Sequence, residues 1–217
     1  MFKNNKFKII LASIITLLPI LAGVILWDKL PEQMPIHWGI NGEVDGYIGK
    51  WQGVVLGPVF LFVLYWFCVI FTLLDPKNKG QNIKAFNLVI FIMPIISLVI
   101  YGFIYSAALG HSLNVASFLY LLLGFMFILI GNYLPKCKQN HTIGIKIPWT
   151  LNSEENWNAT HRFSGKVWVI CGVLILFSIF LPTNFGAYAM IAVAAVMVAL
   201  PIIYSYNYYK RQEGSGK

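Results

Sequence analysis

Apolar residues occur in six long runs that are separated by shorter polar segments. The runs cover residues 9–27, 51–74, 86–109, 114–134, 165–182 and 186–206. Each has a length in the range of about 17 to 25 residues that crosses a bilayer as an α-helix. The first run follows three lysines, but it is too long for the apolar part of a signal peptide and lacks a cleavage site. We therefore expect an all-α, polytopic bundle of six transmembrane helices.

The composition supports a membrane protein and excludes two other classes. Of the 217 residues, 58% are apolar and 11% are charged, and the mean hydropathy is +0.70. Soluble domains carry about 25% charged residues. The formal charge of +8 could suggest nucleic-acid binding, but the basic residues lie at helix ends, so no direct nucleic-acid partner is expected. The three cysteines have no C-x-x-C spacing and predict neither disulfides nor a metal centre.

The distribution of lysine and arginine predicts the orientation. If the helices alternate in direction, 14 of the 16 basic residues lie on one side of the membrane, and the other side keeps Lys29 and Lys50. The positive-inside rule then places both termini of a multi-pass membrane protein in the cytoplasm. The last four residues, 214–217, resemble a cloning remnant and carry no functional expectation.

Two long loops follow the first helix of each three-helix set. Both open with Leu-Pro, and both contain an Ile-x-Trp, at residues 36–38 and 147–149. Because three is odd, the sets at 1–110 and 111–213 would enter the membrane from opposite sides, as inverted repeats do. The alternative is that Leu-Pro simply ends two helices.

The outer loop, residues 28–50, is rich in turn residues and acidic. Asn41-Gly42 favours the tip of a hairpin. Four acidic residues outnumber two lysines, so the loop could attract a cationic extracellular peptide. His37 with Glu43 or Asp45 could hold a metal, although the spacing is irregular; a turn-rich loop on the headgroups is the alternative.

The inner loop, residues 135–164, is more structured. Asn152 followed by Glu155 predicts an N-cap and a short helix over about 153–163, resting at the interface with Trp157 in the headgroups. Trp157 and His161 would share one face with Glu154, while Glu155, Asn158 and Arg162 form the adjoining strip, with Glu and Arg paired. Residues 141–148 are too apolar for a free loop and should dip into the membrane or pack beneath the bundle.

Three interpretations of the inner loop are open. His161 could act as a base oriented by Glu154 or Glu155, but no nucleophile is identifiable. Cys137, His141 and His161 are too few for a defined metal site. A folded cytoplasmic contact surface needs nothing else and is favoured. The middles of the six runs contain no Asp, Glu, Lys, Arg or His, which argues against an ion-driven pump.

The segment from Gly131 to Trp168 resembles the signature of the SdpI family of bacterial integral membrane proteins. The matching elements are Gly131-Asn132, Leu134-Pro135-Lys136, Gly144-Ile145-Lys146, Pro148-Trp149-Thr150-Leu151, Trp157, Thr160-His161-Arg162 and Gly165-Lys166. Lys146 stands where the family often has arginine, which keeps the charge but weakens any bidentate contact. The segment LPEQMPIHWGINGEVDGY resembles an uncharacterised membrane domain that commonly precedes the SdpI region.

This resemblance implies a toxin-immunity protein. The founding member protects its producer cell from a secreted killing peptide and relays the toxin's presence by holding a transcriptional repressor at the membrane. The expected partners are a secreted peptide toxin, a cytoplasmic repressor and membrane lipids; no cofactor, metal or catalytic residue is expected, and so no enzyme. The candidates for binding the toxin or a partner are His37, Trp38, Glu43, Asp45, Asn132, Lys146, Trp149, Glu155, Trp157, His161 and Arg162. A small transporter or lipid flippase built as an inverted repeat is the alternative, and an intramembrane enzyme with His161 as base is third.

Overall fold

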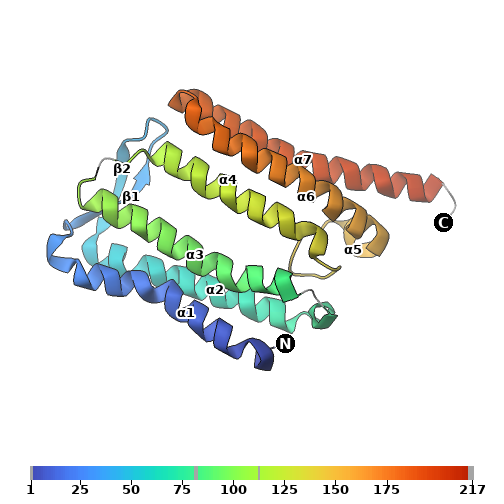
Figure 1. Cartoon of the computed structure of the whole chain (residues 1–217), viewed down its shortest axis with the longest axis horizontal. Coiled ribbons are helices and arrows are strands. Elements are labelled where there is room, and N and C mark those ends of the chain that lie inside the picture. Colours follow the sequence, from blue (N-terminus) through green and yellow to red (C-terminus); the bar gives the residue numbers. More distant parts are fainter. Residues whose placement is uncertain (1, 81–82, 112, 215–217) are drawn as a thin grey trace. The chain divides into compact units, whose positions relative to one another are not determined.

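The computed structural model is mostly helical, with one two-stranded sheet (Figure 1). It describes residues 2–80, 83–111 and 113–214, so three residues of the expected cloning remnant, 215–217, lie outside the described part. The chain forms two compact units. Unit 1 comprises Met1–Leu73 and Asn87–Val115, and unit 2 comprises Leu74–Phe86 and Ala116–Lys217.

Unit 1 contains three long helices and a hairpin. Its elements are α1 (Phe2–Ile25), β1 (Gln33–Trp38), β2 (Val44–Gly49), a π-helical turn (Gln52–Leu56), α2 (Gly57–Leu74) and most of α3 (Ile83–Ala108). Hydroxyl groups link the helices: Tyr105 donates to the carbonyl of Pro19 at 2.8 Å, and Ser97 to that of Thr16 at 2.8 Å. Such bonds, together with van der Waals packing, join helices where water is absent.

Unit 2 contains α4 (Val115–Tyr133), a short α5 (Pro148–Asn152), α6 (Glu154–Phe177) and α7 (Thr183–Gly214). Glycines allow α4 and α6 to approach closely: a Cβ on Gly172 would lie 2.8 Å from the carbonyl oxygen of Gly124, and a Cβ on Gly165 would lie 2.7 Å from that of Gly131. Between α6 and α7, the Asn156 amide donates to the carbonyl of Ser205 at 3.0 Å and accepts from its hydroxyl at 2.7 Å.

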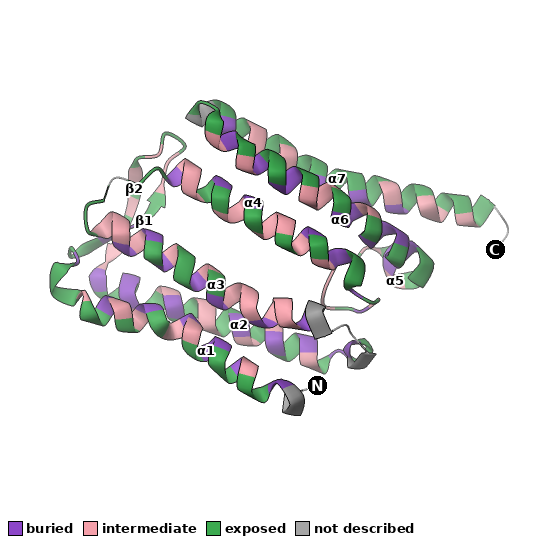
Figure 2. Cartoon of the chain, viewed as in Figure 1, coloured by how far each residue is buried: buried purple, intermediate pink, exposed green. Residues whose placement is uncertain are grey.

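Six helices among the described residues are long and apolar enough to cross a membrane, as the six apolar runs predicted. At most 39% of any span is buried, and exposed positions recur along the helices in Figure 2. Exposed large apolar side chains include Phe7, Phe60, Phe125, Phe177 and Phe180. A helix of such hydropathy that is not covered by protein needs lipid around it. The chain is therefore a multi-pass membrane protein; its orientation and the inverted repeat stay predictions, as does the expected division near residue 110.

The prediction of a separate helix over 153–163 is wrong. These residues and the run at 165–182 form one continuous helix, α6, whose glycine at 165 is accommodated because it packs against α4. The N-cap is Ser153, not Asn152, and its hydroxyl accepts the Asn156 N–H at 3.1 Å. Trp157 does not lie among headgroups either, because it is fully buried.

The hairpin predicted from Asn41-Gly42 is confirmed. Strands β1 and β2 pair antiparallel, with Met34 opposite Ile48 and Trp38 opposite Val44, and a register shift flanks His37. Gly42 has φ +84°, a conformation that glycine adopts without cost. The Gly42 N–H donates to Gly39 and closes the turn.

Candidate functional site

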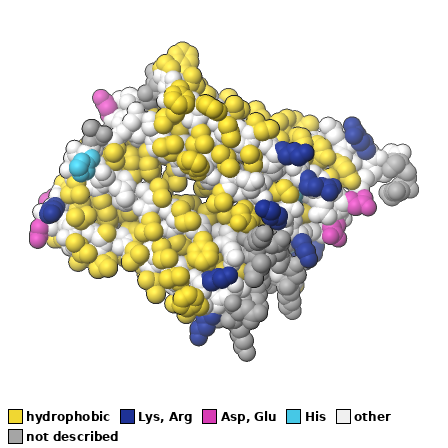
Figure 3. All heavy atoms as spheres, viewed as in Figure 1, with side chains coloured by type: hydrophobic (Ala, Val, Ile, Leu, Met, Phe, Trp, Pro, Cys, Tyr) yellow, Lys and Arg dark blue, Asp and Glu magenta, His cyan; other side chains and the backbone are white. Residues whose placement is uncertain are grey.

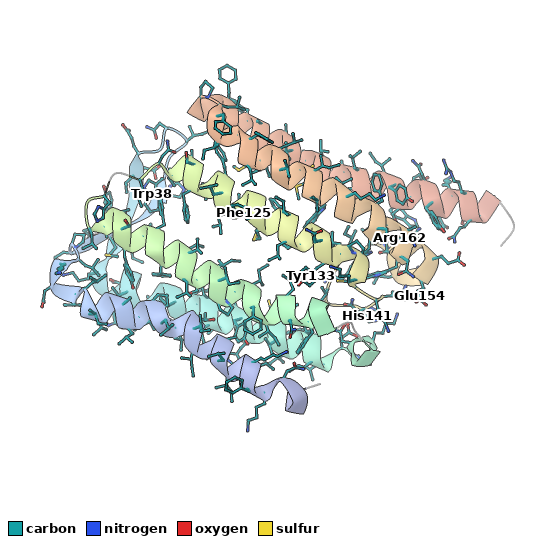
Figure 4. The ribbon with its side chains drawn as sticks, in the orientation of Figure 1. Trp38, Phe125, Tyr133, His141, Glu154 and Arg162 are labelled. Atoms are coloured by element: carbon teal, nitrogen blue, oxygen red, sulfur yellow. The ribbon has the colours of Figure 1, made fainter. Side chains whose placement is uncertain are left out.

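Two polar surfaces could carry function, and each is built within one unit. The first is the hairpin, residues 33–49 of unit 1. The second is the segment of residues 137–147 in unit 2, here called the folded loop, together with the ends of α5, α6 and α7 that surround it. Figure 4 labels Trp38 in unit 1, and His141, Glu154 and Arg162 in unit 2.

The hairpin is anchored at its base and on one side. Lys50, although a lysine, is buried: its ammonium group contacts Glu32 at 2.8 Å and lies 5.4 Å from the centre of the Trp27 ring. Trp38 packs edge-on against Phe103 of α3, with ring centres 5.1 Å apart. Of the two basic residues in the outer loop, Lys50 is thus already paired with an acidic residue of the same protein.

The exposed part of the hairpin brings the predicted residues His37 and Asp45 together, whereas Glu43 contacts Asn41. The His37 side chain is 71% exposed, and its Nδ1 lies 2.5 Å from Asp45 Oδ1. Glu43 accepts a bond from the Asn41 amide at 2.8 Å. Groups of three or more His, Cys, Asp or Glu able to hold a metal do not occur in the described residues, so the geometry gives the metal interpretation no support.

The folded loop is held by buried amides and hydroxyls. Asn140 is fully buried, and its side-chain oxygen accepts the N–H groups of Thr142 at 2.8 Å and Ile143 at 2.6 Å. Gln139 donates to the last carbonyls of α5, those of Thr150 and Leu151. These bonds satisfy backbone groups that a free loop would leave to water, which explains how so apolar a segment is ordered. Of the two predictions for 141–148, packing against the bundle is the one observed.

Asp75 joins the folded loop to the segment that follows α2. Its carboxylate accepts the His141 N–H at 2.7 Å and the Lys77 N–H at 3.0 Å, and it is only 7% exposed. Asn78 donates to the Thr142 hydroxyl at 2.7 Å. The sequence analysis did not single out Asp75. The available signal was its isolation, because Asp75 is the one acidic residue between Asp45 and Glu154.

His161 and Trp157 form the centre beneath the loop. Their rings stack with centres 4.0 Å apart. His161 Nδ1 donates to the Trp157 carbonyl at 2.8 Å, and Nε2 accepts the Ile145 N–H at 3.0 Å, an arrangement that requires the neutral ring. With both nitrogens bound to backbone and 1% exposure, His161 is not available as a base. It positions the loop instead.

Trp157 and Cys137 complete this buried centre. The indole N–H of Trp157 donates to the Cys137 carbonyl at 2.8 Å. Burial raises the pKa of the Cys137 thiol to about 11, so the thiol stays protonated at neutral pH. A protonated, buried thiol is neither a nucleophile nor a metal ligand.

The remaining predicted residues lie at the rim and do not converge on one site. Trp149 of α5 packs edge-on against Tyr206 of α7 at 5.2 Å. Lys146 is exposed and donates to the Thr142 carbonyl at 3.1 Å. Glu155 and Arg162 border one surface depression of about 290 Å³ with Pro135, Asn158 and Tyr208.

The expected pairing of Glu with Arg on this helix is not observed. Glu155 accepts a bond from Gln212 at 2.7 Å, and the Lys–Glu ion pair found among the described residues is Glu32–Lys50. Asn132 lies apart from this strip, near the end of α4, where its amide donates to Ile128 at 3.0 Å.

The chain is similar to known proteins over nearly its whole length. The model of the SdpI/YfhL protein family matches residues 136–205, and that of a domain of unknown function, DUF1648, matches residues 14–62. The chain is 31% identical over 212 residues to a protein named Immunity protein SdpI from Bacillus subtilis (strain 168), covering 96% of this chain and 99% of the relative. No solved structure matches. On this similarity along nearly the whole length of both proteins, the chain belongs to the SdpI family.

Proposed function

We propose that this protein is an immunity protein of the bacterial cell membrane that protects against a secreted antimicrobial peptide. The observation that carries the proposal is the 31% identity to Immunity protein SdpI over 96% of this chain and 99% of the relative. A non-enzymatic role follows from it. The buried, backbone-bonded His161 supports that role, because it removes the residue that the sequence offered as a base.

The hairpin is the proposed surface for the toxin. In the proposed orientation, with both termini cytoplasmic, residues 33–49 face the outside. Glu43 and Asp45 make the hairpin negative, and the neighbouring Lys50 is already paired with Glu32. The side chains of Ile36, Ile40 and Tyr47 are exposed. A peptide that is both cationic and apolar would find complementary groups there.

The folded loop and the surrounding ends of α6 and α7 form the proposed cytoplasmic contact surface. A repressor held at the membrane would meet a rigid surface, because Asn140, Asp75 and His161 fix the loop backbone. The relay proposal is tested by fusing the small repressor encoded nearest the gene to a fluorescent protein. Toxin should move the fusion to the membrane in cells that carry this protein, and an unchanged distribution would contradict the relay.

Immunity is tested by expressing the protein in a sensitive host and measuring survival across a panel of secreted cationic peptides. At least one peptide should kill cells with empty vector far more efficiently than cells that express the protein. Identical killing curves for every peptide would refute the proposal.

The hairpin is tested with a double variant that removes both negative charges, Glu43→Gln with Asp45→Asn. Each exposed charge contributes about 0.2 to 1 kcal/mol to binding a cationic peptide. The expression level needed for protection should therefore be about two- to thirtyfold higher for the double variant than for the unchanged protein. Added salt should reduce this difference. Asp28→Asn is the control, because it removes one exposed charge outside the two strands. If Asp28→Asn reduced protection as much per charge removed as the double variant does, the result would argue against a specific hairpin site.

A further inference from the structure

A surface groove of about 410 Å³ lies between α4 and α6 in unit 2. Its lining includes Gly131 and Asn132 from α4 and Gly165, Lys166, Val169 and Ile170 from α6. The two glycines form its floor: a Cβ on Gly131 would lie 2.9 Å from the Gly165 carbonyl oxygen. The helices are therefore in backbone contact there, and the absence of both side chains leaves the hollow above them.

The groove crosses a boundary between polar and apolar surface. At one end it is lined by the exposed Asn132 and Lys166. Along α6 in the other direction the exposed side chains include Ile170, Leu174 and Phe177, all apolar. In unit 2, Lys and Arg side chains gather toward the end that carries α5, where Asp and Glu side chains also lie, and hydrophobic side chains predominate elsewhere on the visible face (Figure 3).

Basic side chains outnumber the one acidic side chain, Glu155, around the polar end. Arg162 lies one helical turn before Lys166 and borders the neighbouring depression, which shares Pro135 with the groove. Within the described part of the chain neither side chain has an ion-pair partner, and the nearby Glu155 is bonded to Gln212. Lys136 adds a third positive charge, with its ammonium group 4.7 Å from the centre of the Tyr133 ring.

We propose that this groove binds one anionic phospholipid. Its phosphate would lie between Lys166 and Arg162, and an acyl chain would lie along Val169 and Ile170. A free anion would satisfy the basic residues but leave the apolar half of the groove empty. A zwitterionic lipid would bring its own positive charge to a site that is already positive. An anionic headgroup joined to an acyl chain matches both halves.

The test is native mass spectrometry of the full chain in detergent with phosphatidylglycerol or phosphatidylcholine. One phosphatidylglycerol should be retained in preference to phosphatidylcholine. Because each basic residue near an anionic headgroup contributes about fivefold in affinity, Arg162→Gln with Lys166→Gln should weaken retention by about twenty- to thirtyfold. Lys146→Gln, an exposed lysine outside the groove, is the matched control and should change retention less than about twofold.

Several results would overturn the proposal. These are equal retention of the two lipids, unchanged retention in the double variant, and an equal loss for each charge removed in the control, which would indicate diffuse attraction. Displacement of the lipid by inorganic phosphate at the same concentration would assign the site to a free anion. Circular dichroism and thermal unfolding of each variant establish that a loss of lipid is not a loss of fold. None of these outcomes depends on immunity, so the two proposals fail separately.

Discussion

Replacing Gly144 with alanine should detach the folded loop from the centre of unit 2. Gly144 has φ +118°, a backbone conformation that costs an L-residue about 1 to 2 kcal/mol. A Cβ there would also lie 3.0 Å from the Trp157 ring and collide with His161 Nε2, the atom that accepts the Ile145 N–H. Overpacking of this kind costs about 1 to 3 kcal/mol. The total expected loss is therefore about 2 to 5 kcal/mol.

Gly110 offers a matched control for the backbone contribution. It has φ +86°, and a Cβ there would meet no atom within 4 Å. Gly110→Ala should therefore lose only the conformational part, about 1 to 2 kcal/mol. The difference between the two variants isolates the collision with Trp157 and His161.

Cys137 provides the assay, because it is the buried first residue of the folded loop and Trp157 donates to its carbonyl. In a background with Cys68→Ala and Cys171→Ala, thiol labelling reports local opening of this region. A loss of 2 kcal/mol should speed labelling about thirtyfold in Gly144→Ala, with little change in Gly110→Ala. The free energy of unfolding in detergent is measured alongside. Labelling and stability equal to those of the control would refute the role assigned to Gly144.

Three further predictions follow from the same contacts. Burial raises the pKa of the Cys137 thiol to about 11, so its labelling rate in the folded protein should keep rising with pH until about pH 11. In denaturant the rate should instead level off near pH 9.0, the ordinary pKa of the thiol. A plateau near pH 9.0 in the folded protein would contradict the burial. Asp75→Ala leaves the His141 and Lys77 N–H groups without their acceptor and should cost about 1 to 3 kcal/mol; trypsin should then cleave faster at Lys138 and Lys146, while the exposed Asp28→Ala should leave cleavage unchanged. In intact cells, in a background with Cys68, Cys137 and Cys171 all replaced by alanine, an impermeant thiol reagent should label Tyr47→Cys and not Asn158→Cys, and the reverse pattern would invert the proposed orientation.

The errors in the sequence analysis of the inner loop share one cause. The local pattern around Asn152 and Glu155 predicted an interfacial helix with Trp157 in the headgroups, because an amphipathic strip and a cap are local signals. Periodicity does not reveal that residues 137–147 fold over that strip. Once the loop covers it, the indole N–H finds the Cys137 carbonyl and Trp157 becomes a core residue. The same covering occupies both nitrogens of His161 and removes it from the candidate bases.

Asp75 and Lys50 show the same limit for charged residues. Sequence alone marks both as polar residues near helix ends. Their importance lies in partners 66 and 18 residues away, the His141 N–H and the Glu32 carboxylate. Pairing between residues so far apart in the sequence depends on how the elements pack, and the composition does not indicate it.

The sequence by itself determined the six spans and the hairpin. Transfer of about 20 apolar residues into lipid is favourable wherever they occur, and Asn41-Gly42 supports its turn through backbone conformation alone. The tertiary structure decided what the polar residues do. It took Trp157 and His161 out of the candidate contact surface and made them the support of the folded loop. It also opened the groove beside Lys166, because only the close approach of α4 and α6 brings Gly131 next to Gly165.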